Sequence, residues 1–133
     1  DAEAEAEVIY TFGTNDPQPV TLRKIGDWTG DGADEMALGL NTGTSGSGEV
    51  WLFSSEDNDG EYEAEDAAWA TVVGQNDTDE GWYQNTLGAA ISDLPNDLNG
   101  DGKYDFVVSD PEWGNSAGST ALEGRIYVSY GLY

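Results

Sequence analysis

The residues best suited to chemistry are acids gathered in two short loops that share one spacing. Asp27 to Glu35 and Asp97 to Asp105 both follow the pattern D-x-(T/N)-G-D-G-x-x-(E/D). If the chain turns tightly there, the side chains at positions one, three and five converge on one point. Glycine at positions four and six permits such a turn, because it reaches positive φ at little steric cost. The carbonyl of position seven and the acid at position nine can then complete a shell of oxygens.

A shell made only of oxygens favours calcium, which takes about six to eight oxygen ligands, over magnesium, which prefers a rigid octahedron and keeps its waters. The ligands predicted for the first site are Asp27, Thr29, Asp31, the carbonyl of Ala33, and Glu35. The ligands predicted for the second site are Asp97, Asn99, Asp101, the carbonyl of Lys103, and Asp105. Because a Thr hydroxyl is a weaker ligand than an Asn carbonyl, we expect the first site to bind less tightly.

Two other interpretations of these loops were weighed. Asp-Gly and Asn-Gly pairs form ordinary hairpin turns, and an acidic chain produces them by chance, but two loops with matched spacing and matched flanks favour metal binding. An EF-hand needs a Glu at position twelve and a helix on each side. Position twelve is Leu38 in one loop and Val108 in the other, both in predicted strands, so an EF-hand is disfavoured. Ser55 to Gly60 resembles a degenerate third loop, which we interpret as a turn.

Composition narrows the function further. The chain has 133 residues, 27 acids against four bases, and a formal charge of −23. Such a surface repels nucleic acid and anionic membranes, and most of the acids are interpreted as a solvation coat for a salty, halophilic setting. The absence of Cys and His excludes disulfides, imidazole zinc sites and Ser-His-Asp catalysis. No carboxylate pair stands out for glycoside hydrolysis, so we do not expect an enzyme.

The elements that must position these loops read as short strands between turns. The predicted strands are Val8–Phe12, Val20–Ile25, Glu35–Leu40, Gly48–Ser54, Ala68–Val73, Thr86–Ser92, Tyr104–Ser109 and Gly124–Tyr130. Glu61 to Ala70 is the one candidate helix. The pattern predicts an antiparallel sandwich, barrel or propeller, with residues 1–7 as an acidic tail and 8–133 as one all-β domain.

The chain also contains an internal repeat. Three segments recur in the same order in the two halves. Phe12–Asp16 matches Val73–Asp77, Gly26–Glu35 matches Asn96–Asp105, and Gly48–Phe53 matches Gly124–Ser129. The repeats span about 8–66 and 67–133, each with four strands around one Asp loop. Four antiparallel strands make a propeller blade, so we predict an all-β fold of two four-stranded blades.

The motifs of this repeat resemble a known family. Gly26 to Gly39 resembles the calcium-loop half of an FG-GAP repeat, the blade unit of integrin-alpha-type β-propellers, and Asp97 to Pro111 does the same. Ser109-Asp110-Pro111 stands where the family has Gly-Ala-Pro, and Leu87-Gly88 stands where it has Phe-Gly. Gly39-Leu40-Asn41 departs from the Gly-Ala-Pro pattern. The resemblance implies a calcium ion that pins a hairpin at the propeller rim, and a role in adhesion or recognition outside the cell or at its surface.

Two blades do not close a ring, since natural propellers use about four to eight. Val8–Phe12 matches the outer strand Ala68–Val73, whereas no such strand follows Gly124–Tyr130. The spare strand could close onto the last blade, pass to another copy in a ring or filament, or belong to a longer chain. We therefore expect self-association, or an extracellular protein or glycan as partner.

The tryptophans suggest a different class of function. Trp82 and Trp113 lie in predicted loops, where they could stack on sugars in a carbohydrate-binding, lectin-like domain. An accessory domain of a secreted hydrolase is a further alternative. Trp51 and Trp69 are expected to pack in the core or between blades, and Trp28 is expected to cover the first loop.

Overall fold

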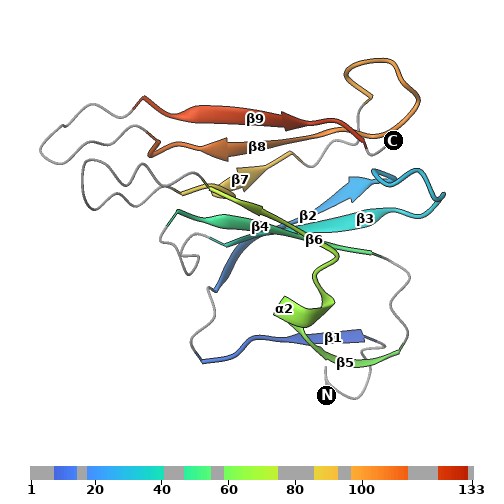
Figure 1. Cartoon of the computed structure of the whole chain (residues 1–133), viewed down its shortest axis with the longest axis vertical. Helices are drawn as coiled ribbons and strands as arrows, with labels where there is room; N and C mark the ends of the chain where they lie inside the picture. Colours follow the sequence, from blue (N-terminus) through green and yellow to red (C-terminus); the bar gives the residue numbers. More distant parts are fainter. Residues whose placement is uncertain are drawn as a thin grey trace, which may run out of the picture.

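The regular secondary structure of the described residues is almost entirely β-strand. The computed structural model describes residues 8–14, 18–40, 47–54, 59–74, 86–92, 97–113 and 123–131. The strands are β1 (Val8–Thr11), β2 (Pro19–Gly26), β3 (Glu35–Leu40), β4 (Glu49–Phe53), β5 (Gly60–Glu63), β6 (Ala70–Val73), β7 (Ala90–Ile91), β8 (Phe106–Asp110) and β9 (Arg125–Ser129). One turn of helix, α2 (Ala64–Ala67), follows β5. The predicted all-β class is confirmed (Figure 1).

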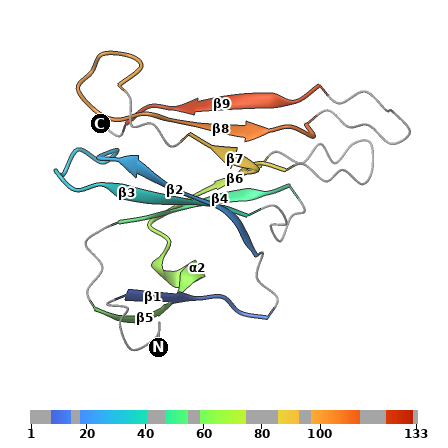
Figure 2. The ribbon, with the colours of Figure 1, turned by 180° about the vertical axis from the view of Figure 1, so that it is seen from behind.

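The strands form three sheets that stack as layers. The middle sheet has four antiparallel strands in the order β2-β3-β4-β6, and a three-stranded antiparallel sheet, β7-β8-β9, lies on one of its faces. The parallel pair β1-β5, with α2, lies on the other face (Figures 1 and 2). Each sheet is open among the described residues, so of the two four-stranded sheets expected the structure shows one, and it shows no closed ring.

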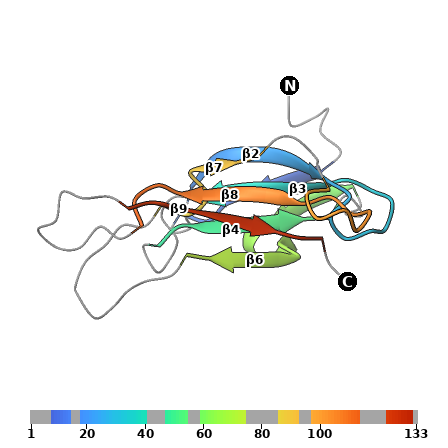
Figure 3. The ribbon, with the colours of Figure 1, turned by 90° about the horizontal axis from the view of Figure 1, so that it is seen from above.

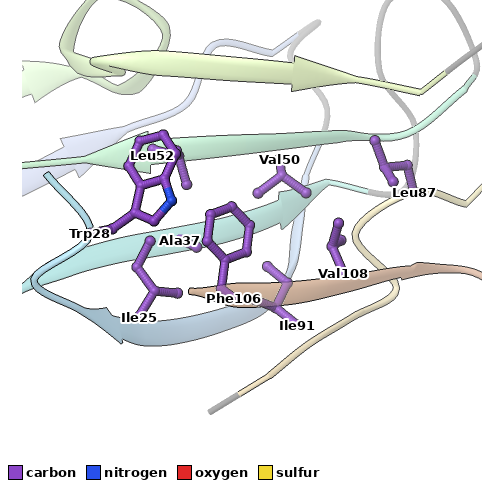
Figure 4. Packing of buried hydrophobic residues seen from close by; sticks show 9 residues of the cluster. All are labelled: Ile25, Trp28, Ala37, Val50, Leu52, Leu87, Ile91, Phe106 and Val108. Atoms are coloured by element: carbon purple, nitrogen blue, oxygen red, sulfur yellow. The ribbon is translucent and has the colours of Figure 1, made fainter. Parts of the chain in front are cut away.

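Two apolar clusters hold the layers together. The first joins the middle sheet to the β7-β8-β9 sheet (Figure 4) and consists of Ile25, Trp28, Ala37, Val50, Leu52, Leu87, Ile91, Phe106 and Val108. The second, on the opposite face, packs Leu38, Leu40, Trp51 and Phe53 against Ala64 and against the N-terminal residues Tyr10 and Phe12. Every residue of β4 is buried, because this strand is central in a sheet that is covered on both faces.

The internal repeat is reproduced in the strand pairing. Five residue pairs join β3 to β4, from Met36 with Phe53 to Leu40 with Glu49. The corresponding five pairs join β8 to β9, from Phe106 with Ser129 to Asp110 with Arg125. The registers are the same in both repeats. The chain therefore builds the same hairpin twice, and each copy carries its Asp loop just before its first strand.

The N-terminal strand does not complete the last sheet. β1 pairs in parallel with β5, from Val8 with Gly60 to Thr11 with Glu63, and Thr11 Oγ1 also donates to the Tyr62 carbonyl. Closure of β1 onto β9 within the chain, one of the outcomes left open by the sequence, is therefore wrong. β6 pairs with β4 and completes the first sheet, although a repeat boundary near residue 66 would assign it to the second half.

Segment 60–70 is where the sequence prediction failed most. Glu61 to Ala70 was the one candidate helix, and of it only Ala64 to Ala67 is helical, between β5 and β6. β5 is stabilised by its pairing with β1, a contact between residues about fifty positions apart that local propensity does not report. Likewise, only Ala90 and Ile91 of the predicted strand Thr86–Ser92 are in β7, since Gly88 has a φ of +91°.

Candidate metal centre

The first Asp loop is organised by its own carboxylates. Asp27 Oδ1 accepts a hydrogen bond from the Gly30 amide at 2.7 Å, and its Oδ2 accepts one from Gly32 at 3.0 Å. Asp31 Oδ1 accepts one from the Ala33 amide at 2.8 Å. These bonds fold residues 27–33 into a compact turn between β2 and β3, so that the carboxylates at positions one and five face the same space.

Glu35 closes the same loop from the start of β3. Its Oε2 accepts hydrogen bonds from the amides of Trp28 at 2.7 Å and Thr29 at 3.0 Å, and the Thr29 hydroxyl donates to Oε1 at 3.3 Å. The side chain is almost fully buried. Burial raises the pKa of Glu35, the nearby charge of Asp31 raises it further, and the bonds from Thr29 and Trp28 offset part of the effect. Ionised Glu35 is therefore costly unless a cation lies beside it.

Three of the predicted ligands come together in this loop. One carboxylate oxygen from each of Asp27, Asp31 and Glu35 lies within 4.8 Å of the other two. Three negative charges at that separation repel one another, and a hard divalent cation between them would turn the repulsion into attraction. Thr29 and Ala33 lie in the same turn. The donor set, made of carboxylate, hydroxyl and carbonyl oxygens, fits calcium.

The second Asp loop repeats the three hydrogen bonds that Asp27 and Asp31 accept in the first. Asp97 Oδ1 accepts from Gly100 at 2.6 Å and its Oδ2 accepts from Gly102 at 2.8 Å, while Asp101 Oδ1 accepts from the Lys103 amide at 2.9 Å. The Lys103 amide bond, followed by one from the Asn99 side chain, lowers the pKa of Asp101. Asp101 therefore stays ionised and available to a cation across the physiological pH range.

The acid at position nine distinguishes the two loops. Asp105 Oδ2 accepts from the Leu98 amide at 2.7 Å, as Glu35 does from Trp28, but its Oδ1 accepts from the Gly131 amide at 3.1 Å. Aspartate is one methylene shorter than glutamate, so Asp105 reaches less far into its loop. Among the described residues, no second trio of acids comes as close as Asp27, Asp31 and Glu35. The expected order of affinity, with the first site weaker, stays a prediction, and this geometry favours the reverse.

The glycines at positions four and six have the conformation that the pattern predicted. Gly30 and Gly32 have φ of +82° and +98°, and Gly100 and Gly102 have φ of +80° and +88°. A Cβ added at Gly32, Gly100 or Gly102 would meet no atom within 4 Å. Backbone conformation, rather than lack of space, is therefore what requires glycine at these positions.

The two loops lie side by side at one end of the molecule (Figure 1). The Tyr104 amide donates to the Asp27 carbonyl at 3.4 Å. The aliphatic part of the Lys103 side chain lies against Gly30, where an added Cβ would be 3.6 Å from Lys103 Cε. The first loop therefore contacts the second directly, and no pattern in the sequence predicted this contact.

Trp28 connects the first loop to the core rather than covering the loop. Its ring is buried, with edge-on contacts to Phe106 and Trp69 at centroid distances of 5.8 Å each, and its Nε1 donates to the Tyr130 carbonyl at 3.1 Å. The expectation that Trp28 covers the loop is wrong, because an indole at this point fills the space between two sheets. Its amide still donates to Glu35, so the candidate ligand and the core share one residue.

The candidate sugar-binding tryptophans receive little support. Trp82 lies outside the described residues. The guanidinium carbon of Arg125 lies 3.1 Å from the ring centroid of Trp113, so one face of that ring is already covered by a cation. A sugar could stack only on the other face. The lectin-like function stays a prediction.

A hollow that the sequence did not predict adjoins the first loop on its other side. It has a volume of about 730 Å³, and Tyr10, Met36 and Phe53 line it together with Arg23 and Lys24. Lys24 forms an ion pair with Asp34, and Glu35 also borders the hollow. Together with Lys103, which lies against Gly30, three of the four basic residues of the chain therefore lie beside the candidate metal loop.

None of the described helices is long and apolar enough to cross a membrane. Comparisons with models of protein families, with curated proteins and with solved structures found no match.

Proposed function

We propose that this chain is a calcium-binding β-module of the propeller-blade type, in which the ion has a structural role. The observation that carries the proposal is the convergence of Asp27, Asp31 and Glu35 within 4.8 Å, in a loop whose hydrogen-bond network recurs in the second repeat. Chance Asp-Gly turns have no reason to share these bonds. The matching bonds of Asp97 and Asp101 support a second calcium ion in the second loop.

Calcium would stabilise this fold by removing an electrostatic cost. In the absence of a cation, the fold holds a buried Glu35 close to two further carboxylates. A bound ion would tie the end of β2 to the start of β3, and Trp28 would pass that constraint to the core between the sheets. The backbone bonds of Asp27 and Asp97 hold the loops in place beforehand, so little ordering entropy is lost on binding.

The finer assignment of the fold and setting rests on the repeat and on the resemblance to FG-GAP blades. The sheet β2-β3-β4-β6 has the four antiparallel strands of one propeller blade. The sheet β7-β8-β9 corresponds to its first three strands, β2-β3-β4. We propose that the module works outside the cell or at its surface, in adhesion or recognition. The 27 acids support a salty, halophilic environment.

Thermal melting during calcium titration tests the metal centre. A ligand that binds only the folded state adds about 2.7 kcal/mol of stability at a concentration of 100 Kd, so the melting temperature should rise with calcium and fall after EDTA. Asp31→Asn removes one carboxylate from the first loop, and Asp101→Asn does so in the second. Each should reduce the number of ions bound, measured by isothermal titration, from two to one, and the double variant should bind none.

The matched control is Asp34→Asn, which removes the same charge from the same loop but leaves the three clustered carboxylates in place. It should keep both ions. Calcium-independent melting of the unaltered chain, at constant ionic strength, would contradict the proposal. So would equal loss of binding in the control and in Asp31→Asn, because the effect would then come from net charge alone.

A further inference from the structure

The β7-β8-β9 sheet has one face on the core and one face turned outward. The outer face consists of Val107, Ser109, Ile126 and Val128, and of Tyr130, which directly follows β9. The first four alternate along β8 and β9 with the core-facing Phe106, Val108 and Tyr127. Ile126 is 72 % exposed, Tyr130 is 52 % exposed and Val128 is 44 % exposed. Strands whose two faces are both apolar are typical of sheets covered on both sides.

The repeat shows what this kind of face does elsewhere in the same molecule. In the first repeat, the positions equivalent to Val107, Ile126 and Val128 are held by Ala37, Val50 and Leu52. All three of these residues have no exposed surface, because the β7-β8-β9 sheet packs on them (Figure 4). The outer face therefore occupies the same positions as an established sheet-to-sheet interface. Val107 and Ile126 are larger than their counterparts Ala37 and Val50, and Val128 is smaller than Leu52.

Charge makes this face unusual in the molecule. None of its five residues is acidic, although 27 of the 133 residues of the chain are. The nearest charge on β9 is the cation of Arg125. Two molecules that each carry a charge of −23 repel through most of their surface, and a neutral apolar face is where that repulsion is smallest.

We propose that a second copy of this chain covers the outer face, outer face against outer face, about a two-fold axis. A head-to-tail stack would need an open face equivalent to Phe106 and Val108. The residues of the middle sheet that correspond to these two, Met36 and Leu38, belong to the cluster that includes Tyr10 of β1 and Ala64 of α2. With that face already covered, the outer face of the second copy is the surface that remains to pack on the outer face of the first. An interface made by the same surface on both copies closes a dimer. Two such sheets would pack about 10 Å apart.

Figure 3 views the molecule from above, on the side of the β7-β8-β9 sheet. β8 and β9 lie over the middle sheet there, and among the described residues β9 pairs with β8 alone. The interface differs from the strand donation that the sequence left open, since β1 is already paired with β5. Association through the outer face leaves that pairing and both Asp loops intact.

Sedimentation of the full chain in high salt, over a wide concentration range, tests the dimer. The unaltered chain should show the mass of two copies, and Ile126→Glu and Val128→Glu should each weaken self-association at least tenfold, because each places two new charges in the interface. The control is Val20→Glu, which makes the same change at a strand residue that is 51 % exposed and lies in β2. It should leave the dimer unchanged.

Thermal melting of each variant shows whether it still folds, and calcium titration separates this inference from the proposed metal centre. A mass of one chain for the unaltered protein at every concentration would overturn the dimer, and would leave a further repeat or a different protein as the occupant of the face. A dimer that persists in folded Ile126→Glu and Val128→Glu would also overturn it. In either case, calcium-dependent melting would still support the metal centre.

Discussion

At the scale of the residue, two glycines of this chain are required for two different physical reasons. Gly102 has a φ of +88° and open space around it, so a side chain there is opposed only by backbone strain. Gly39 does not have a positive φ, but an added Cβ would lie 2.1 Å from the Gly88 carbonyl oxygen. The first glycine shapes a loop, and the second lets two sheets approach.

These two causes predict different costs. Gly102→Ala should lower the free energy of unfolding by about 1–2 kcal/mol, the cost of a left-handed conformation for an L-residue. Gly39→Ala should cost more, because two backbone segments must separate. Chemical denaturation in calcium and high salt measures both. An equal cost for the two variants would show that close approach at Gly39 is not a separate constraint.

At the scale of the element, Asp110 ties the end of β8 to the segment that precedes β7. Its Oδ1 accepts from the Thr86 amide at 2.8 Å, its Oδ2 has no hydrogen-bond partner among the described residues, and the residue is fully buried. Burial raises the pKa of Asp110, while the amides of Thr86 and Glu112 and the charge of Arg125 oppose the shift. Asp110 lies in Ser109-Asp110-Pro111, which stands where the FG-GAP pattern has Gly-Ala-Pro.

Because the pKa of Asp110 is raised in the folded state, the stability of the fold depends on pH. The folded state holds the proton of Asp110 to a higher pH than the unfolded state, in which the pKa is near 3.8. As pH rises above about 3.8, the contribution of this group to stability is therefore lost, and the loss is complete above the folded pKa. Asp110→Asn keeps an oxygen acceptor for Thr86 without a charge, and should reduce the fall in stability over this window. Urea denaturation at a series of pH values, compared between the two proteins, measures the difference. Identical slopes would contradict the assignment.

At the scale of the whole molecule, net charge opposes folding. The formal charge of −23 repels itself, and salt shortens the range of that repulsion from about 10 Å at 0.1 M to about 3 Å at 1 M. The melting temperature should therefore rise steeply between these concentrations even without calcium. NaCl and KCl should act alike, because screening depends on ionic strength. A melting temperature that does not change with either salt would show that the acids are not a solvation coat.

The sequence alone determined the local features. The Asp loops, the glycines at positive φ, most strand positions and the repeat itself follow from residue type and spacing, because turn geometry and alternation are properties of neighbouring residues. The equal registers of β3-β4 and β8-β9 follow from the repeat as well.

The tertiary structure decided how these parts meet. The pairing of β1 with β5, the place of Trp28 between two sheets, and the contact between the two Asp loops all join residues far apart in the chain. So does the contrast between buried Ala37, Val50 and Leu52 and their exposed counterparts in β8 and β9. The two repeats have nearly the same pattern, and only the stacking order of the sheets makes one face core and leaves the other open to solvent.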